Sequence, residues 1–443
     1  MGVGPLFWPA PFLPGGEAQA MKIIIVGGGW AGCAAALCAR KSGAEVLLLE
    51  RTDMLLGTGL VGGILRNNGR FTAAEECIAM GGGDLFLLAD TCLRHKNIDF
   101  PGHQHADLYD VARMPAAVAR SLAQAGVQVF YMARVVKVQM EGNRLQAVHG
   151  EDGRRFDADV FIDATGTFGP VANCTKHGNG CVMCIMRCPG FGGRVSLCGL
   201  AGVKETNARR AGGLHGSMSG ACKLMKESLA PGLVKQLNQT GVAVLPVPED
   251  VKENRLGHKA CQQYALEEFC DNLILLDTGH AKLMVTYFEL HKLQSIPGFE
   301  SARYEDPYAG GKGNSMRFFD MAPRDDALKV LGLENVFCAG EKAGPLVGHT
   351  EAIATGALAG HNAARYGRNM PLLVLPRSLA VGEAVAFVRE KLQLDSGLSL
   401  RFTFSGSVLF ERIKELELYT TDVAVIGARV KAAGLYQALS NWD

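Results

Sequence analysis

The stretch KIIIVGGGWAGCAAALCARKSGAEVLLLE, residues 22–50, constrains the fold of this 443-residue chain more than any other. A β-branched run predicts a buried parallel strand, and Gly27, Gly29 and Gly32 follow it as GxGxxG. An alanine-rich helix and a second strand ending in Glu50 complete the pattern. We expect Gly27 to make the turn, Gly29 to admit a pyrophosphate and Gly32 to let the helix pack on the strand. Glu50 is placed to accept a ribose hydroxyl, so the stretch predicts a dinucleotide-binding α/β unit.

Two later stretches continue this unit. DADVFIDATGTFGP, residues 157–170, predicts a buried strand that ends in an Ala-Thr-Gly turn, and LENVFCAGEKAG, residues 333–344, predicts another. Ligands of parallel α/β sheets bind at the carboxyl ends of such strands. Besides the glycines and Glu50 above, we therefore predict cofactor contacts from a further set of residues: Arg51, Gly62, Gly63, Thr165, Gly166, Gly340, Glu341, Gly348 and Thr350.

Together, the early GxGxxG, the mid-chain ATG and the late strand ending in glycine plus an acid resemble FAD-binding oxidoreductases of the glutathione-reductase-like fold. FCAGEKAGPLVGHTEAIATGALAGHNAAR, residues 337–365, resembles the glucose-inhibited division protein A family, which includes two flavoenzymes that modify tRNA uridines. The residues that carry this likeness are Gly340, Gly344, Gly348, Glu351, Gly356, Gly360, Asn362, Ala363 and Ala364. The resemblance implies non-covalently bound FAD and a doubly wound parallel sheet, with an inserted substrate domain and a short helical C-terminal tail.

The loop after the second strand departs from that family. The two tRNA-modifying relatives carry a cysteine there, whereas LLGTGLVGGILRNNGR, residues 55–70, has glycines and no cysteine. We still expect this loop to cover the flavin. His349 stands where the relatives have tyrosine, and we predict that it is a catalytic residue contacting flavin or substrate. Thr350 is expected to cap a helix whose small residues both allow close approach to a flat ligand such as the flavin ring and pack tightly in the core.

A dense group of thiols lies in NCTKHGNGCVMCIMRCPGFGGRVSLC, residues 173–198, which holds five of the 13 cysteines. Cys181, Cys184 and Cys188 with the following proline read C-x2-C-x3-C-P, three quarters of a bacterial ferredoxin run. Cys174 is placed to be the fourth ligand. The four thiols predict a 4Fe-4S cluster or zinc. Cys181 and Cys184 alone could instead form a catalytic redox pair, or all four could be plain thiols in a loop.

Net charge and the length of apolar runs limit the partners and the cellular compartment that we expect for this protein. The formal net charge is +1, which gives no excess of positive charge for nucleic acid. Apolar runs are too short for a transmembrane helix, and residues 1–20 resemble a flexible leader rather than a secretory signal. We therefore expect a cytoplasmic protein with reduced cysteines and no membrane partner.

The predicted organisation is discontinuous. Residues 21–60, 112–172 and 330–368 form the FAD-binding domain, and residues 61–111 form a loop-rich, flavin-covering region. Residues 173–329 form a cysteine-rich substrate domain, with a helix near 262–272 and a strand near 281–291. The helical tail, residues 371–443, is expected to cap the body or to form a homo-oligomer contact.

These patterns predict an FAD-dependent oxidoreductase that passes electrons between flavin and a cysteine-based redox centre or a bound small-molecule substrate. One alternative is a tRNA uridine-modifying flavoenzyme, with tRNA as its partner. The other is an FAD- or metal-binding subunit of an electron-transfer complex, with a redox protein as its partner. His103 and His105, which follow a Pro-Gly turn, are further candidates for a substrate pocket.

Overall fold

The computed structural model describes residues 21–166, 191–210, 213, 216–218, 221–305 and 316–442. Its centre is a five-stranded parallel sheet whose order is β19-β10-β1-β2-β6. The strands are β1 (Lys22–Val26), β2 (Glu45–Leu49), β6 (Gln128–Phe130), β10 (Val160–Asp163) and β19 (Val336–Cys338). The apolar residues of β1, β2, β10 and β19 are almost all buried, as expected for a parallel sheet covered on both faces. The predicted fold class is confirmed.

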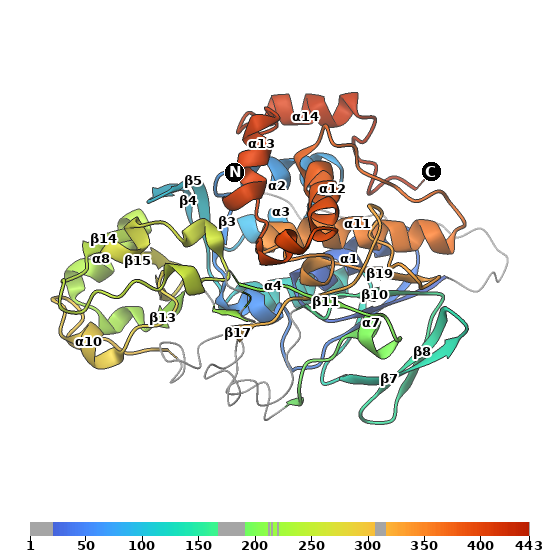
Figure 1. The fold of residues 1–443 in the computed structure, drawn as a ribbon, viewed down its shortest axis with the longest axis horizontal. Coiled ribbons are helices and arrows are strands. Elements are labelled where there is room, and N and C mark those ends of the chain that lie inside the picture. The colour runs from blue at the N-terminus through green and yellow to red at the C-terminus, as the bar shows by residue number, and fades with distance from the viewer. Residues whose placement is uncertain are drawn as a thin grey trace.

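Two helices lie side by side on one face of this sheet: α1 (Trp30–Arg40) and α11 (His349–Gly367) (Figure 1). They approach closely because α11 presents glycines to the backbone of α1. A Cβ atom on Gly356 would lie 2.2 Å from the carbonyl oxygen of Ala31, and one on Gly360 would lie 2.2 Å from that of Ala35. Gly356 and Gly360 of α11 therefore face a helix, whereas Ala352, nearer the start of α11, lines the pocket.

An antiparallel sheet, β7 (Val135–Glu141), β8 (Arg144–Gly150) and β9 (Arg155–Asp157), lies on the opposite side of the parallel sheet (Figure 1). Before it, α4 (Met114–Gln124) packs against α1 and leads into β6. This arrangement of helices on one face and a small sheet on the other gives the FAD-type unit two covering layers.

Residues 61–111, predicted as loop-rich, contain ordered elements. After η1 (Gly57–Val61) come β3 (Ile64–Leu65), α2 (Arg70–Ala79), α3 (Asp84–Asp90), β4 (Leu93–Phe100) and β5 (His103–Tyr109). The strands form a sheet in the order β3-β5-β4. His103 is buried within it, where its Nε2–H donates to the carbonyl of Gln263 at 3.0 Å. Burial lowers the pKa of His103 to about 3, so this ring stays neutral and packs in the core, and it is not an acid that protonates a substrate.

A second unit is built on a four-stranded antiparallel sheet with a core of its own. In spatial order its strands are β13 (Cys222–Leu224), β16 (Ala281–Leu283), β15 (Asn272–Asp277) and β14 (Val242–Pro246). Three helices flank them: α8 (Pro231–Thr240), α9 (Glu268–Asp271) and α10 (Leu290–Gln294). The helix predicted over 262–272 is only η4 (Gln262–Tyr264) followed by α9, and the strand predicted over 281–291 ends at Leu283.

The remaining elements between β10 and α11 are short. They are α7 (Leu197–Leu200), η2 (Lys226–Ser228), η3 (Leu256–His258), η5 (Gly340–Lys342) and two strand pairs, β11 (Thr206–Asn207) with β18 (Asp320–Met321) and β12 (Ser217–Met218) with β17 (Met316–Arg317). The strands of the second unit follow β10 and precede β19 in the chain, so this unit is an insertion in the FAD-type unit.

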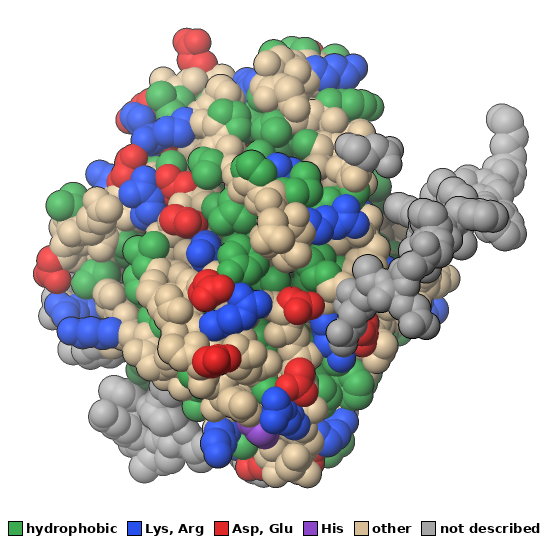
Figure 2. Space-filling model, turned by 90° about the vertical axis from the view of Figure 1, so that its right-hand side faces the viewer, with side chains coloured by type: hydrophobic (Ala, Val, Ile, Leu, Met, Phe, Trp, Pro, Cys, Tyr) green, Lys and Arg blue, Asp and Glu red, His purple; other side chains and the backbone are tan. Residues whose placement is uncertain are grey.

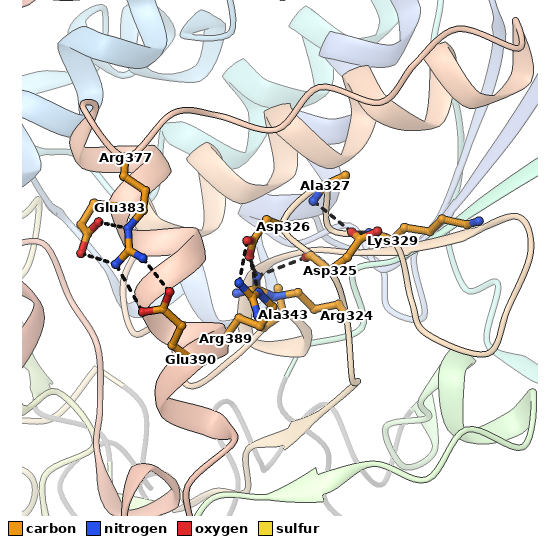
Figure 3. A network of polar contacts seen from close by, with 10 residues as sticks. All are labelled: Arg324, Asp325, Asp326, Ala327, Lys329, Ala343, Arg377, Glu383, Arg389 and Glu390. Carbon is orange, nitrogen blue, oxygen red and sulfur yellow. Dashed lines mark hydrogen bonds and ion pairs between the residues drawn. The ribbon is translucent and has the colours of Figure 1, made fainter.

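The tail folds as α12 (Ala380–Leu392), η6 (Asp395–Ser399), α13 (Ser407–Glu415) and α14 (Val423–Ala432). Figure 3 shows how α12 is held: Arg389 donates to the Asp326 carboxylate at 2.6 and 2.9 Å, and Arg377 joins Glu383 to Glu390. Asp326 belongs to the loop before β19, so these ion pairs fix the tail to the strand that leads into the cofactor side of the sheet. The tail therefore caps the body, one of its two predicted roles.

The surface carries mixed charge. On the face drawn in Figure 2, basic and acidic side chains of the described residues are interspersed among apolar and polar ones. Within the described part of the chain, none of the helices is at once long and apolar enough to cross a membrane.

Candidate cofactor pocket and active site

One large pocket opens at the carboxyl ends of β1, β2, β10 and β19, with about 1590 Å³ of empty space, part of it open to solvent. Its lining includes the residues that directly follow these strands, and also residues of the inserted unit. Since ligands of open α/β sheets bind at this edge, the topology alone marks it as the binding site.

The glycine turn after β1 has the geometry of a phosphate cradle. Gly27 has φ +106°, and a Cβ there would lie 2.3 Å from the carbonyl oxygen of Ala164, so only glycine fits. Gly32 packs its Cα against Gly27 in the same way. Gly29 also lines the pocket but differs in its surroundings, because a Cβ there would meet nothing within 4 Å. The first turn of α1 has no side-chain cap, so its N–H groups and this open space suit an anionic pyrophosphate.

Glu50 is held at the end of β2 by three donors. Its Oε2 accepts from the N–H of Gly28 at 2.8 Å, and its Oε1 accepts from the N–H and the hydroxyl of Thr52, each at 2.8 Å. A carboxylate has further lone pairs, and Glu50 lines the pocket, so it can accept a ribose hydroxyl. This donor set and the cradle at Gly29 both fit the adenosine diphosphate part of FAD.

At the other end of the pocket, His349 lies among aromatic side chains. The Tyr109 hydroxyl lies 3.3 Å from His349 Nδ1, and the Trp30 ring centroid is 5.6 Å from that of His349. Burial raises the pKa of Tyr109 far above its ordinary value, so the phenol keeps its proton and can donate it to Nδ1. Gly62 lies directly over this pair, because a Cβ there would be 1.9 Å from His349 Cε1.

The start of α11 is fixed by a buried ion pair. Arg70 Nε lies 3.1 Å from Glu351 Oε1, and Arg70 Nη2 donates to the carbonyl of Val347 at 2.9 Å. Burial opposes the charge of Arg70, but Glu351 outweighs it and the pKa of the guanidinium is raised. Gly348, between Val347 and His349, therefore sits where the pocket meets the N-terminus of α11.

The inserted unit supplies the facing wall, which the sequence did not reveal. Its lining side chains are Cys261, Gln263, Tyr264, Lys282 and Met284. Lys282 Nζ donates to the carbonyls of Val61 and Gly62, at 2.7 Å for Gly62, and so ties β16 to the loop after η1. No local motif marks these positions, because they meet the pocket only through tertiary packing. Of the nine described cysteines, Cys261 is the one that lines this pocket.

A buried lysine braces the same wall from behind. Lys259 Nζ donates to the carbonyl of Tyr264 at 2.6 Å and to that of Met284 at 3.3 Å. Its burial lowers its pKa to about 8. The two carbonyls belong to residues that line the pocket, so Lys259 positions the wall without reaching the cavity itself.

The structure distributes the predicted site residues unevenly. Eleven of them line the pocket: Gly27, Gly29, Glu50, Arg51, Gly62, Thr165, Gly166, Gly340, Glu341, Gly348 and His349. Gly32 and Gly63 lie behind it, the latter against Thr278. Thr350 is not the helix cap that we predicted, because α11 begins one residue earlier with Gly348 as its N-cap. Cys174, Cys181, Cys184 and Cys188 lie outside the described residues.

Cys198, the fifth cysteine of that stretch, is buried beside Asp163 and Glu205. Its N–H donates to the Asp163 carboxylate at 2.9 Å. The buried Lys342 forms an ion pair with Glu205. The Lys342 ammonium thus already compensates the negative charge of these carboxylates. We interpret the cluster as buried charges that neutralise one another.

Comparison with known proteins agrees with this geometry. Residues 22–173 match the model of the FAD dependent oxidoreductase family, and residues 222–371 match that of glucose inhibited division protein A. The structure resembles GidA from Aquifex aeolicus in two crystal forms. For form II the TM-score is 0.60 at 15% identity, over 94% of this chain and 77% of that one. For form I the TM-score is 0.58 at 14% identity, over 94% and 79%.

The two family matches lie at either end of the pocket described above. The first covers the glycine turn, Glu50 and the turn after β10, and the second covers the wall of the inserted unit and the start of α11. The chain therefore belongs to the FAD-dependent oxidoreductases related to glucose inhibited division protein A, and it is an FAD-dependent enzyme.

Proposed function

We propose that the enzyme transfers two electrons between its flavin and a substrate that binds against the wall formed by the inserted unit. One observation carries this proposal: a single cavity is lined on one side by Gly29 and Glu50 and on the other by Tyr264, Lys282 and Cys261. A cofactor held by the first group leaves the second group facing the remaining space. Polar and thiol side chains there suit a small ligand that must be oriented for redox chemistry.

FAD supplies the carrier of two electrons when it is bound. The residues that would hold it are Gly29 at the phosphates, Glu50 at a ribose, and Gly348 with His349 at the ring system. The chain's own contribution at the ring is a pair of groups that can share a proton. Tyr109 keeps its phenolic proton and lies 3.3 Å from His349 Nδ1, and donation to Nδ1 would leave the imidazole proton on Nε2.

Enclosure is the second contribution. Lys282 fastens the loop of Val61 and Gly62 to β16, and Lys259 fastens the carbonyls of Tyr264 and Met284. Both lysines are buried, so their hydrogen bonds hold the walls of the pocket together where water is excluded. A site assembled from two units in this way keeps a redox reaction away from solvent.

We propose two roles for cysteine thiols, one inside the pocket and one in a separate redox centre. Cys261 places a thiol in the pocket itself. In addition, we infer that electrons pass between the flavin and a centre made by Cys174, Cys181, Cys184 and Cys188, on the C-x2-C-x3-C-P spacing. A thiolate centre that takes single electrons would complement a two-electron carrier.

Modification of a tRNA uridine is a second candidate. The match of residues 222–371 to glucose inhibited division protein A favours it, because this part of the chain forms the facing wall. The formal net charge of +1 and the mixed charges of Figure 2 weigh against a large RNA footprint. RNA that copurifies, and binding that weakens steeply with salt, would favour this candidate over a small free substrate.

The test is anaerobic purification followed by measurement of FAD, iron, zinc and acid-labile sulfide per chain. FAD with iron and sulfide supports the electron-transferring enzyme with its cysteine centre. FAD without metal or sulfide removes that centre and leaves Cys261 as the thiol for redox chemistry. A protein that takes up no FAD contradicts the proposed function as a whole.

A further inference from the structure

Gln263 carries an unused hydrogen-bond acceptor in the wall of the pocket. The residue is only 4% exposed and lines the cavity, yet its side-chain oxygen has no hydrogen-bond partner among the described residues. Its main chain, in contrast, is firmly held. His103 donates to the carbonyl of Gln263 at 3.0 Å. Gly406 packs closely against Gln263, since a Cβ atom on Gly406 would lie 2.6 Å from the Cβ of Gln263. A buried acceptor without a donor is costly, so the position points to a ligand group.

The donors of Arg70, which also lines the pocket, are committed elsewhere. Arg70 donates from Nε to Glu351, from Nη1 to Asn67 and from Nη2 to Val347 and Thr403. Arg70, Gln263 and Tyr264 all line the pocket. Through Arg70 and Val347 this group adjoins the start of α11. Gln263 thus lies at the ring end of the pocket, remote in the chain from the cradle at Gly29.

The ligand group must be a hydrogen-bond donor, since an amide oxygen only accepts. The oxidised flavin ring has a single N–H, the imide N3–H of its pyrimidine part, with a carbonyl on each side. We propose that the side-chain oxygen of Gln263 accepts a hydrogen bond from this imide N–H and so helps to orient the flavin. This contact is additional to the assignment of FAD, because the glycine turn and Glu50 bind the adenosine diphosphate part and do not identify the residue that contacts the flavin ring.

The test compares FAD with N3-methyl-FAD, in which a methyl group replaces that donor hydrogen, in equilibrium titrations followed by flavin fluorescence. We expect the wild-type protein to bind FAD about tenfold more tightly than N3-methyl-FAD, the worth of one buried hydrogen bond. Gln263→Met keeps the length of the side chain and removes the acceptor, so this preference should vanish. Gln262→Met is the matched control. Its amide donates to the Lys259 carbonyl at 2.6 Å and does not line the pocket, so it should keep the wild-type preference.

The readout is binding alone and needs no substrate. Equal affinity of the wild type for the two flavins overturns the proposal, whether or not the variants fold. A preference that persists undiminished in Gln263→Met also overturns it, because another group then accepts the imide N–H. Failure of the proposed function looks different: the wild type would bind neither flavin, or would bind FAD without any redox turnover.

Discussion

Gly62→Ala offers a sharp test of the ring end of the pocket. The backbone of Gly62 has φ −72° and ψ −122°, and the contacts that a methyl group would make there set the expected effect. The new methyl group would lie 1.9 Å from His349 Cε1, 2.8 Å from its Nδ1 and 2.6 Å from the Tyr109 hydroxyl oxygen. All three contacts are far inside van der Waals distance, so His349 must leave its place and lose its partner Tyr109.

Inserting a methyl group into a packed site costs about 1–3 kcal/mol. His349 lines the pocket, so an imidazole displaced into the cavity would occupy space assigned to FAD. Each 1.4 kcal/mol of that cost weakens binding roughly tenfold, and we expect the Kd for FAD to rise by about 5- to 150-fold. The assays are FAD titration by fluorescence and thermal unfolding of the FAD-free protein.

Gly232→Ala is the matched control. Gly232 lies in α8, far along the chain from the pocket residues, and a Cβ there meets nothing within 4 Å. Alanine should leave FAD binding unchanged and stabilise the helix by about 0.5–1 kcal/mol. If Gly62→Ala binds FAD and unfolds like this control, the placement of His349 under Gly62 is refuted.

Three further predictions follow from the described contacts. Glu50→Gln replaces one of the two acceptor oxygens with an NH2 group, which would then face the N–H of Gly28 or of Thr52. FAD should therefore bind at least about tenfold more weakly to this variant. Glu45→Gln, on the same strand, is the control and should bind FAD normally. Burial raises the pKa of Glu76 from 4.5 to about 7, so its stabilising contribution is complete below pH 4.5 and is lost as the pH rises toward 7. The melting temperature of the wild type should therefore fall relative to Glu76→Gln between these values, and a constant difference would contradict the shift. Bound FAD fills part of the pocket that Cys261 lines, so alkylation of Cys261, but not of the half-buried Cys270, should slow without stopping when FAD is bound; equal rates for Cys261 with and without FAD, measured by mass spectrometry, would contradict its place in the pocket.

The parallel sheet could be predicted because its signals are local. The strand, glycine turn and helix of residues 22–40 are adjacent in the chain, and each later strand ends in its own turn. The same holds for Glu50, whose distance from the glycine turn is set by one helix and one strand. Such patterns specify the cofactor edge before any tertiary contact is known.

The facing wall could not be predicted in this way. Cys261 and Lys282 reach the pocket because the β3-β5-β4 sheet and the inserted sheet share a core around Tyr264 and Met284. No spacing in the sequence encodes that contact. The start of α11 was misjudged for a related reason, since Gly348 takes φ +148° and lets the helix begin before Thr350, although threonine is the better capping residue.

The central claim is that FAD lies with its pyrophosphate at Gly29, and one titration tests it most directly. Gly29→Leu can fold normally, because its backbone is extended and a Cβ meets nothing within 4 Å, but its side chain fills the space assigned to the phosphates. We predict that the wild type binds one FAD per chain, whereas Gly29→Leu unfolds at the temperature of the FAD-free wild type and binds none. A Gly29→Leu protein that binds FAD as the wild type does would contradict the account.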